Sequence, residues 1–204
     1  MSEKPEDRAF GPSADNGWVH VRPVGLESAT TWRNVADVTN FLFENPDVKL
    51  MIEIGANFCG FAALMIARTI VFPDFGYLGI EKEVNRKNAN LEFYMATRPR
   101  CKVIWDDCFA EVVKAEAKAW VEATAGHALI WCDGNNKPEE IRQYSPFLRV
   151  GDYLMMHDYS HEKLCDENPS WQDCRPLVES GKFQVAVPSY WAASAMMFLL
   201  RRVN

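Results

Sequence analysis

A glycine-containing loop between two apolar segments is the feature that most limits the folds open to this chain. Residues 50–54 form an apolar run that contains Glu53, and Gly55 and Gly60 follow with the spacing Gly-x-x-x-x-Gly. A helix-like apolar stretch comes after Gly60, and a second short apolar run ends in Ile80-Glu81. In parallel sheets such loops lie at the carboxyl ends of strands, where nucleotide-type ligands bind. The sequence therefore predicts an α/β sheet with a ligand site beside Gly55.

Strand-like and helix-like segments alternate along the rest of the chain. The expected strands cover residues 49–54, 76–81, 101–105, 128–132, 152–156, 183–188 and 195–201, and the expected helices cover residues 60–69, 84–96, 109–125, 138–144 and 171–180. This order predicts a Rossmann-like, doubly wound, seven-stranded sheet that is mostly parallel, with helices on both faces. Only residues 189–194 separate the last two strands, too few for a parallel crossover, so the last strand is expected to be antiparallel.

The N-terminal part of the chain differs from the rest. Residues 1–28 are rich in proline, glycine, serine and charge and show no sustained hydrophobic period, so we expect a tail or lid there. One domain is expected over residues 29–204. Trp32, Val35 and Val38 begin a repeat at three and four residues, which predicts an amphipathic helix.

Composition and charge argue against several classes of protein. The net charge is −6 and no basic run exceeds two residues, so the positive patch of a nucleic-acid binder is missing. No apolar stretch approaches the ~18 residues of a membrane span, and the N-terminus is polar, so we expect no membrane association and a cytoplasmic location. The six cysteines form no Cys-x-x-Cys pair, which indicates reduced thiols rather than a zinc site. The seven tryptophans and the N-terminal arm are compatible with a homodimer.

Three residues after the expected strands bear on the ligand. Asn57 stands where a dinucleotide-binding loop has the glycine that lets the backbone approach a pyrophosphate, which argues against NAD or FAD. Glu81, 21 residues after Gly60, can accept both hydroxyls of a ribose, although a surface glutamate is the alternative. Asp107, after the third strand, can accept a hydrogen bond from an adenine amino group or cap the helix that follows.

Two further acids, Asp133 and Asp158, follow the fourth and fifth expected strands. Beside the point where the strand order reverses, two carboxylates can hold a divalent cation such as Mg²⁺, or one can act as a base. His157 and His161 are further candidates for the base, although either can instead be structural. Side chains alternate along a strand, so His157 and Asp158 face opposite sides unless the strand has already ended.

Over residues 48–204 the chain resembles class I S-adenosylmethionine-dependent methyltransferases. The segment from Asp133-Gly-Asn to His157-Asp-Tyr is similar to a branch of small-molecule O-methyltransferases in which Asp-Gly-Asp/Asn-His precedes a helix, a Leu-x-x-Gly-Gly turn and His-Asp-Tyr. Here Asn136 replaces the histidine, which removes a candidate acid, base or ligand. Asp152 replaces the second glycine, which is expected to alter only the turn.

The resemblance implies methyl transfer from S-adenosylmethionine to a small-molecule acceptor, on a hydroxyl oxygen. It implies that His157, Asp158 or His161 removes the acceptor's proton, and that Mg²⁺, where used, binds Asp133 and Asp158. Three alternatives remain open, namely a binding or regulatory protein without catalysis, a protein or nucleic-acid methyltransferase, and a nicotinamide-dependent oxidoreductase. The residues that the resemblance assigns to the cofactor are Glu53, Gly55, Ala56, Asn57, Gly60, Glu81, Lys82, Asp107, Cys108 and Asp133.

Overall fold

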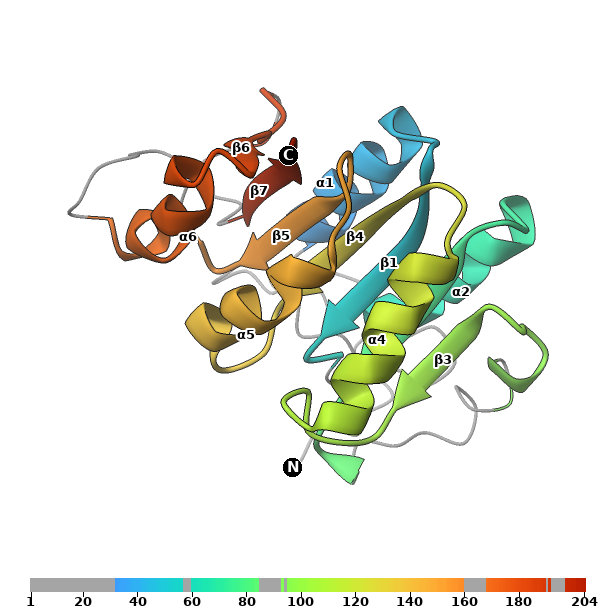
Figure 1. Ribbon diagram of the computed structural model, residues 1–204. Coiled ribbons are helices and arrows are strands. Elements are labelled where there is room, and N and C mark those ends of the chain that lie inside the picture. The colour runs from blue at the N-terminus through green and yellow to red at the C-terminus, as the bar shows by residue number, and fades with distance from the viewer. Residues whose placement is uncertain are drawn as a thin grey trace, which may run out of the picture.

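A seven-stranded sheet forms the centre of the molecule (Figure 1). The computed structural model describes residues 32–56, 60–84, 93, 95–159, 168–189, 191 and 197–204. Along the sheet the strand order is β3-β2-β1-β4-β5-β7-β6. The predicted Rossmann-like doubly wound fold is confirmed. The strands are β1 (Val48–Ile54), β2 (Gly76–Ile80), β3 (Cys101–Ile104), β4 (His127–Cys132), β5 (Tyr153–His157), β6 (Phe183–Val185) and β7 (Met197–Arg202).

The direction of the strands fixes where a ligand can bind. Strands β1 to β5 are parallel, whereas β7 runs antiparallel to both β5 and β6, as the short final connection predicts. At the carboxyl end of β1, Ile54 lies opposite Ile80 of β2 and Cys132 of β4. The chain runs outward from β1 through β2 to β3 and then returns across the sheet to β4. The strand order therefore reverses between β1 and β4, and ligands of open α/β sheets bind at that point.

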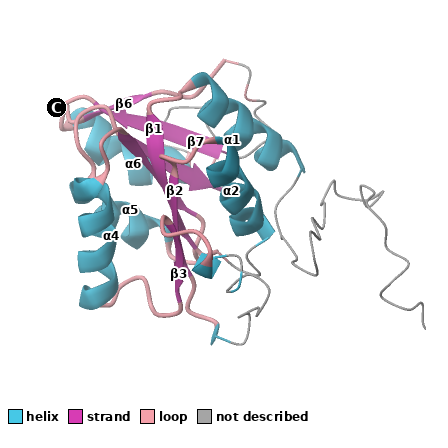
Figure 2. Cartoon of the chain, turned by 90° about the vertical axis from the view of Figure 1, so that its right-hand side faces the viewer, coloured by secondary structure: helices cyan, strands magenta, loops and turns pink. Residues whose placement is uncertain are grey.

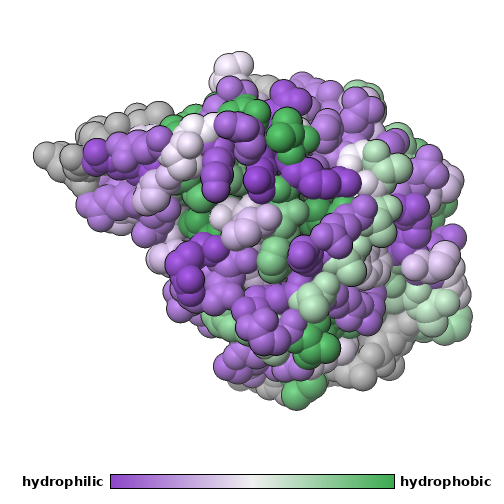
Figure 3. All heavy atoms as spheres, in the orientation of Figure 1, coloured by the Kyte–Doolittle hydropathy of each residue, from purple (hydrophilic) through white to green (hydrophobic). Residues whose placement is uncertain are grey.

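Two layers of helices cover the sheet (Figure 2). One face carries α1 (Trp32–Glu44) and α2 (Gly60–Val71), and the other carries α4 (Glu111–Ala123), α5 (Lys137–Tyr144) and α6 (Pro169–Glu179). Each layer buries an apolar stripe against the strands, and the outer surface over α4 and α5 is mostly hydrophilic (Figure 3). None of the helices in the described ranges is long and apolar enough to cross a membrane.

Some boundaries differ from the sequence-based prediction for local reasons. The helix predicted over residues 109–125 begins only at Glu111, because Asp107 accepts a hydrogen bond from the backbone N–H of Phe109 (2.9 Å) and holds a turn before the helix. The helix predicted from Trp171 begins two residues earlier, at Pro169, since the Asn168 side chain accepts a hydrogen bond from the Ser170 N–H (3.0 Å). Most of the helix predicted over residues 84–96, and all of segment 1–28, lie outside the described residues.

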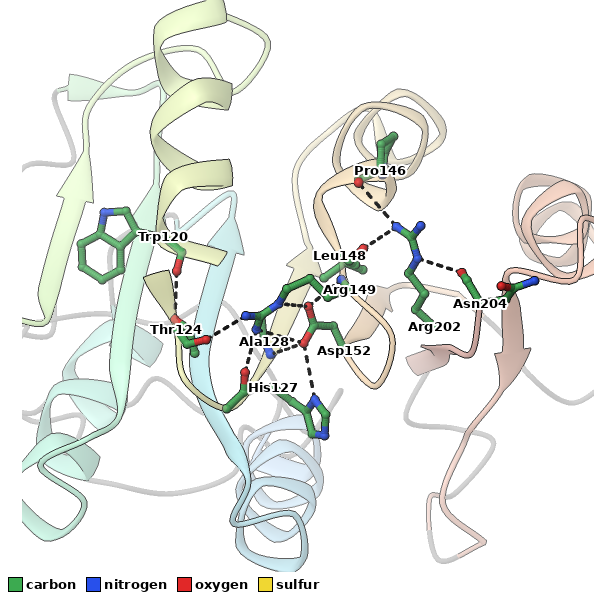
Figure 4. A network of polar contacts seen from close by, with 11 residues as sticks. Trp120, Thr124, His127, Ala128, Pro146, Leu148, Arg149, Asp152, Arg202 and Asn204 are labelled. Carbon is green, nitrogen blue, oxygen red and sulfur yellow. Dashed lines mark hydrogen bonds and ion pairs between the residues drawn. The ribbon is translucent and has the colours of Figure 1, made fainter. Parts of the chain in front are cut away.

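The carboxylate of Asp152 connects three chain segments at the amino ends of β4 and β5, opposite the predicted ligand site (Figure 4). The side chain of Asp152 is fully buried. One oxygen accepts a hydrogen bond from the Ala128 N–H (2.8 Å), and the other accepts bonds from the backbone N–H (2.7 Å) and the Nε (3.1 Å) of Arg149. The Arg149 guanidinium also donates to the carbonyl oxygens of Thr124 and Gly126. Asp152 therefore does much more than alter a turn, which corrects the expectation from the sequence.

Candidate functional site

A cleft of about 390 Å³ opens at the carboxyl ends of β1, β2, β3 and β4. Its walls are the loops that follow these four strands, as the reversal of strand order predicts. Each of the loops after β2, β3 and β4 contributes at least one acidic residue to the lining. The lining residues are Ile54, Gly55, Ile80, Glu81, Lys82, Glu83, Asp106, Asp107, Cys108, Phe109, Asp133, Gly134, Asn135, Asn136 and Glu140.

Gly55 lines the cleft and has a backbone conformation that other residues rarely adopt. Its φ angle is +85°, and a Cβ atom there would lie 2.7 Å from the carbonyl oxygen of Asp133. The N–H groups of Gly55 and Ala56 both donate to the carbonyl of Ile80, at 2.9 and 3.2 Å. The loop after β1 is thus fixed against the ends of both β2 and β4, and the close approach requires glycine. Gly60 begins α2, whereas Asn57 lies outside the described residues.

Glu53 is a buried acid beneath this loop. It is 3% exposed, and the hydroxyl of Tyr77 donates a hydrogen bond to its Oε2. Burial raises the pKa of Glu53 to about 8, the Tyr77 hydrogen bond opposes that shift, and the charges of Asp133 and Glu81 add to it. Near neutral pH this carboxyl therefore carries a proton in most molecules.

Glu81 and Asp107 lie on the β2 and β3 side of the cleft. Glu81 is 4% exposed, and its Oε1 accepts a hydrogen bond from the N–H of Glu83 (2.8 Å). The Nζ of Lys82 lies 3.4 Å from Asp107, and the hydrogen bond from the Phe109 N–H, with Lys82, lowers the pKa of Asp107. Burial raises the pKa of Cys108 to about 12, so this thiol is not a thiolate at neutral pH.

Asp133, His157 and Asp158 come together at the ends of β4 and β5. The Nδ1 of His157 lies 2.7 Å from Asp133 Oδ1 and 3.6 Å from Asp158 Oδ1. Strand β5 ends at His157, and Asp158 has a φ angle of +60°, so the two side chains meet instead of facing opposite sides. Burial lowers the pKa of His157, but the hydrogen bond and charge of Asp133, with the charge of Asp158, outweigh it and leave the pKa raised.

Two residues of this region were missed from the sequence, Lys137 and Glu140. The carboxylate of Glu140 accepts hydrogen bonds from the N–H groups of Gly134 (3.2 Å) and Asn136 (3.1 Å), and so holds the loop after β4. Lys137 donates to the carbonyl oxygen of Gly134 (3.0 Å) and to Oδ2 of Asp158 (3.3 Å). The sequence signal for Glu140 is Pro138-Glu-Glu, which predicts only the start of the helix expected over residues 138–144, and Lys137 lies just outside that range. His161 lies outside the described residues.

Asp133, His157 and Asp158 each offer a potential metal-ligand atom, and these atoms lie within 4.8 Å of one another. The donor set fits Mg²⁺ poorly, because Mg²⁺ prefers a shell of oxygen atoms and one of these donors is an imidazole nitrogen. Two of the atoms are already hydrogen-bonded to each other, and the third donor, Asp158, is paired with the Lys137 ammonium. Among the described residues, no other group of three such ligands occurs.

Comparison with known proteins identifies the fold. No protein-family model and no curated protein matches the sequence. A ligand-free structure of CmcI matches 90% of this chain and 76% of its own chain, at 16% identity and a TM-score of 0.66. CmcI with SAH matches 99% of this chain and 95% of its own, at 16% identity and a TM-score of 0.60. The O-methyltransferase TomG from Streptomyces achromogenes, solved with SAM, matches 87% and 82%, at 13% identity and a TM-score of 0.56.

A further CmcI structure contains Mg and SAM. The chain therefore has the Rossmann-like fold of class I methyltransferases, the class that the sequence resemblance named. At identities of 13% to 16%, this likeness establishes the architecture of the chain.

Proposed function

We propose that this chain is a methyltransferase that moves the methyl group of S-adenosylmethionine to a hydroxyl oxygen of a small molecule. The observation that carries the proposal is the placement of Glu81, Asp107 and Asp133 directly after or just beyond β2, β3 and β4, around one cleft. Glycine at position 55 lets the loops approach closely there. The fold shared with SAM-bound TomG supports the same ligand.

Within this proposal, the loops divide the cofactor between them. Glu81 accepts hydrogen bonds from the ribose hydroxyls, because a carboxylate can take both. Asp107, held beside Lys82, accepts from the adenine amino group, with Cys108 next to it. The loop after β1 and the acids beneath it hold the methionine part, through Glu53, Gly55, Ala56, Gly60 and Asp133. A role for Asn57 stays a prediction.

Glu81→Gln should weaken binding of S-adenosylhomocysteine by about ten- to 100-fold, because a carboxamide accepts more weakly and its NH₂ group opposes a hydroxyl donor. Isothermal titration of the wild type and the variant measures this change. Glu116 lies on α4 and forms an exposed ion pair with Lys102 of β3. Glu116→Gln is therefore the matched control and should bind S-adenosylhomocysteine as the wild type does. A folded wild-type protein that does not bind S-adenosylhomocysteine would exclude the proposed cofactor.

The acceptor side of the proposal places proton removal on His157. S-adenosylmethionine supplies, when bound, a methyl group on a positively charged sulfur. Asp133 accepts a hydrogen bond from Nδ1–H of His157, which sets the tautomer and puts the ring's acceptor lone pair on Nε2. The pKa of His157 is raised, so its neutral imidazole binds a proton more strongly than an ordinary histidine does. Asp158, which is 58% exposed and paired with Lys137, is the weaker candidate.

His157→Ala should lower turnover by about 100-fold while S-adenosylhomocysteine still binds, because general-base catalysis typically contributes at least this much. The measurement is formation of S-adenosylhomocysteine from S-adenosylmethionine with a panel of phenols and aliphatic alcohols. His161→Ala and Asp158→Ala, assayed in parallel, compare the other two candidates. Near wild-type rates in all three variants would contradict general-base catalysis by these residues.

A further inference from the structure

Lys137 lies at a place where a lysine is electrostatically unfavourable for its own helix. It is the first residue of α5, and the amino-terminal end of a helix carries partial positive charge. Its side chain is nevertheless only 14% exposed and reaches away from the helix. A lysine with no role beyond solubility would extend into water from this position.

The ammonium group of Lys137 bridges the loops that follow β4 and β5. It donates to the carbonyl oxygen of Gly134 (3.0 Å) and to Oδ2 of Asp158 (3.3 Å). Burial raises the pKa of Asp133, and Lys137 is among the positive charges that oppose this rise. Lys137 likewise adds to the effect of burial in lowering the pKa of His157. The charge of Lys137 thus acts on each member of the cluster formed by Asp133, His157 and Asp158.

This cluster resembles a metal-binding site, but the Lys137 ammonium already lies beside it. Two carboxylates, Asp133 and Asp158, lie with His157 within the span of a metal-binding group. A divalent ion at their centre would have to displace the Lys137 ammonium and break the 2.7 Å hydrogen bond between His157 and Asp133. The poor fit of the donor set to Mg²⁺ also argues against a divalent ion at this cluster.

We propose that the Lys137 ammonium takes the place of a divalent cation on the acceptor side of the cleft. This inference rests on the proposed function, since it concerns the same site. The acceptor's O–H bond breaks, its proton passes to His157, and the oxygen electron pair forms the new bond to the methyl carbon as the carbon–sulfur bond breaks toward sulfur. Lys137 stabilises the negative charge that develops on that oxygen.

The proposal also specifies the class of acceptor. A divalent ion binds best to two adjacent oxygen atoms of an acceptor, as in a vicinal diol, whereas a single ammonium group needs only one. We therefore expect a phenol or an alcohol with one hydroxyl group to be methylated as well as its vicinal-diol counterpart. Turnover should be the same in EDTA and in Mg²⁺.

A metal-binding experiment tests the proposal without cofactor, acceptor or turnover. Loss of the free Mn²⁺ signal in electron paramagnetic resonance reports binding to the wild type, Lys137→Met and Lys118→Met. Lys137→Met should bind Mn²⁺ at least about ten times more tightly than the wild type, because a positive charge next to the two acids is removed. Adding Asp158→Asn should abolish the gain. Lys118→Met, which removes an exposed lysine of α4, should behave as the wild type.

Turnover and cofactor binding complete the test. Lys137→Met should reduce kcat by about 100-fold with unchanged affinity for S-adenosylhomocysteine, and Lys137→Arg should restore most of kcat. Tight, Asp158-dependent Mn²⁺ binding by the wild type would overturn the proposal, as would a Lys137→Met protein that gains no Mn²⁺ binding. Thermal unfolding of each variant separates these results from misfolding, with Lys137→Arg as the variant that retains the charge. Failure to bind S-adenosylhomocysteine would instead refute the proposed function and leave the Mn²⁺ result standing.

Discussion

Asp152→Ala should lower the free energy of unfolding by about 3 to 5 kcal/mol, the usual cost of removing one partner of a buried ion pair. The carboxylate is fully buried and accepts the N–H groups of Ala128 and Arg149. Without it, both N–H groups lose their acceptor, at about 1 to 3 kcal/mol for each buried donor. The positive charge of Arg149 stays partly stabilised after the substitution, because this side chain is partly exposed to water. Its guanidinium also still donates to the carbonyl oxygens of Thr124 and Gly126.

Urea-induced unfolding measures this loss, with two comparisons that define its cause. Asp152→Asn keeps one oxygen acceptor and should lose roughly half as much, since one of the two N–H groups stays paired. Glu116→Ala removes an exposed ion pair with Lys102 and should cost less than about 1 kcal/mol. Because the Asp152 network lies at the amino ends of β4 and β5, the folded Asp152→Asn protein should bind S-adenosylhomocysteine normally. Equal losses for Asp152→Ala and Glu116→Ala would contradict the assigned role.

The role of Asp152 shows where prediction from the sequence reaches its limit. The sequence predicts Asp152 in the turn that leads into the fifth strand and as the first residue of that strand, and in the structure it directly precedes β5. What the sequence did not reveal is that this turn packs against the start of β4, 24 residues earlier. A carboxylate that accepts hydrogen bonds from residues so far away along the chain leaves no periodic signal, and the sequence alone shows only an aspartate in place of a glycine.

Residues at strand ends were more predictable. Glu53, Glu81 and Asp133 each follow or end an apolar run, and parallel strands bring such ends to one edge of the sheet. Glu140 was missed because local rules already explain Pro138-Glu-Glu as a helix start. Lys137 was missed because it stands just before the helix expected over residues 138–144, and no sequence rule gives it a role there. Their contacts with Gly134 and Asp158 depend on how α5 packs beside the loops.

The meeting of His157 and Asp158 depended on one backbone angle. Alternation along a strand would have separated the two side chains, and the sequence could not tell where β5 ends. The positive φ of Asp158 turns the chain directly after His157. Such a conformation is uncommon outside glycine, and aspartate is among the residues that adopt it more readily. Neither hydrophobic pattern nor charge spacing reports it.

The stability of the wild type should fall as the pH rises from about 5.5 to about 8.5, and Glu53→Gln should remove about 3 kcal/mol of that fall. Burial raises the pKa of Glu53 to about 8 in the folded state, whereas the ordinary pKa of a glutamate side chain is 4.5. Between these two values the folded protein keeps a proton that the unfolded chain has released. The contribution is therefore complete below the unfolded pKa and is lost as the pH rises through the folded pKa.

The groups that face Glu53 explain why the effect should be large. Tyr77 donates a hydrogen bond to the carboxyl, whereas Asp133 and Glu81 place further negative charge beside it. Ionised Glu53 is thus a buried charge whose neighbours are mostly acids, and glutamine keeps the acceptor for Tyr77 without that charge. Urea unfolding of the wild type and Glu53→Gln across this pH range measures the difference, in which titration of His157 and other groups cancels. Tyr77→Phe should shift the wild-type transition to higher pH, because its hydroxyl stabilises the ionised form. Parallel pH profiles for the wild type and Glu53→Gln would show that this carboxyl is already ionised at neutral pH, and that the acids beneath the cleft are better solvated than their burial implies.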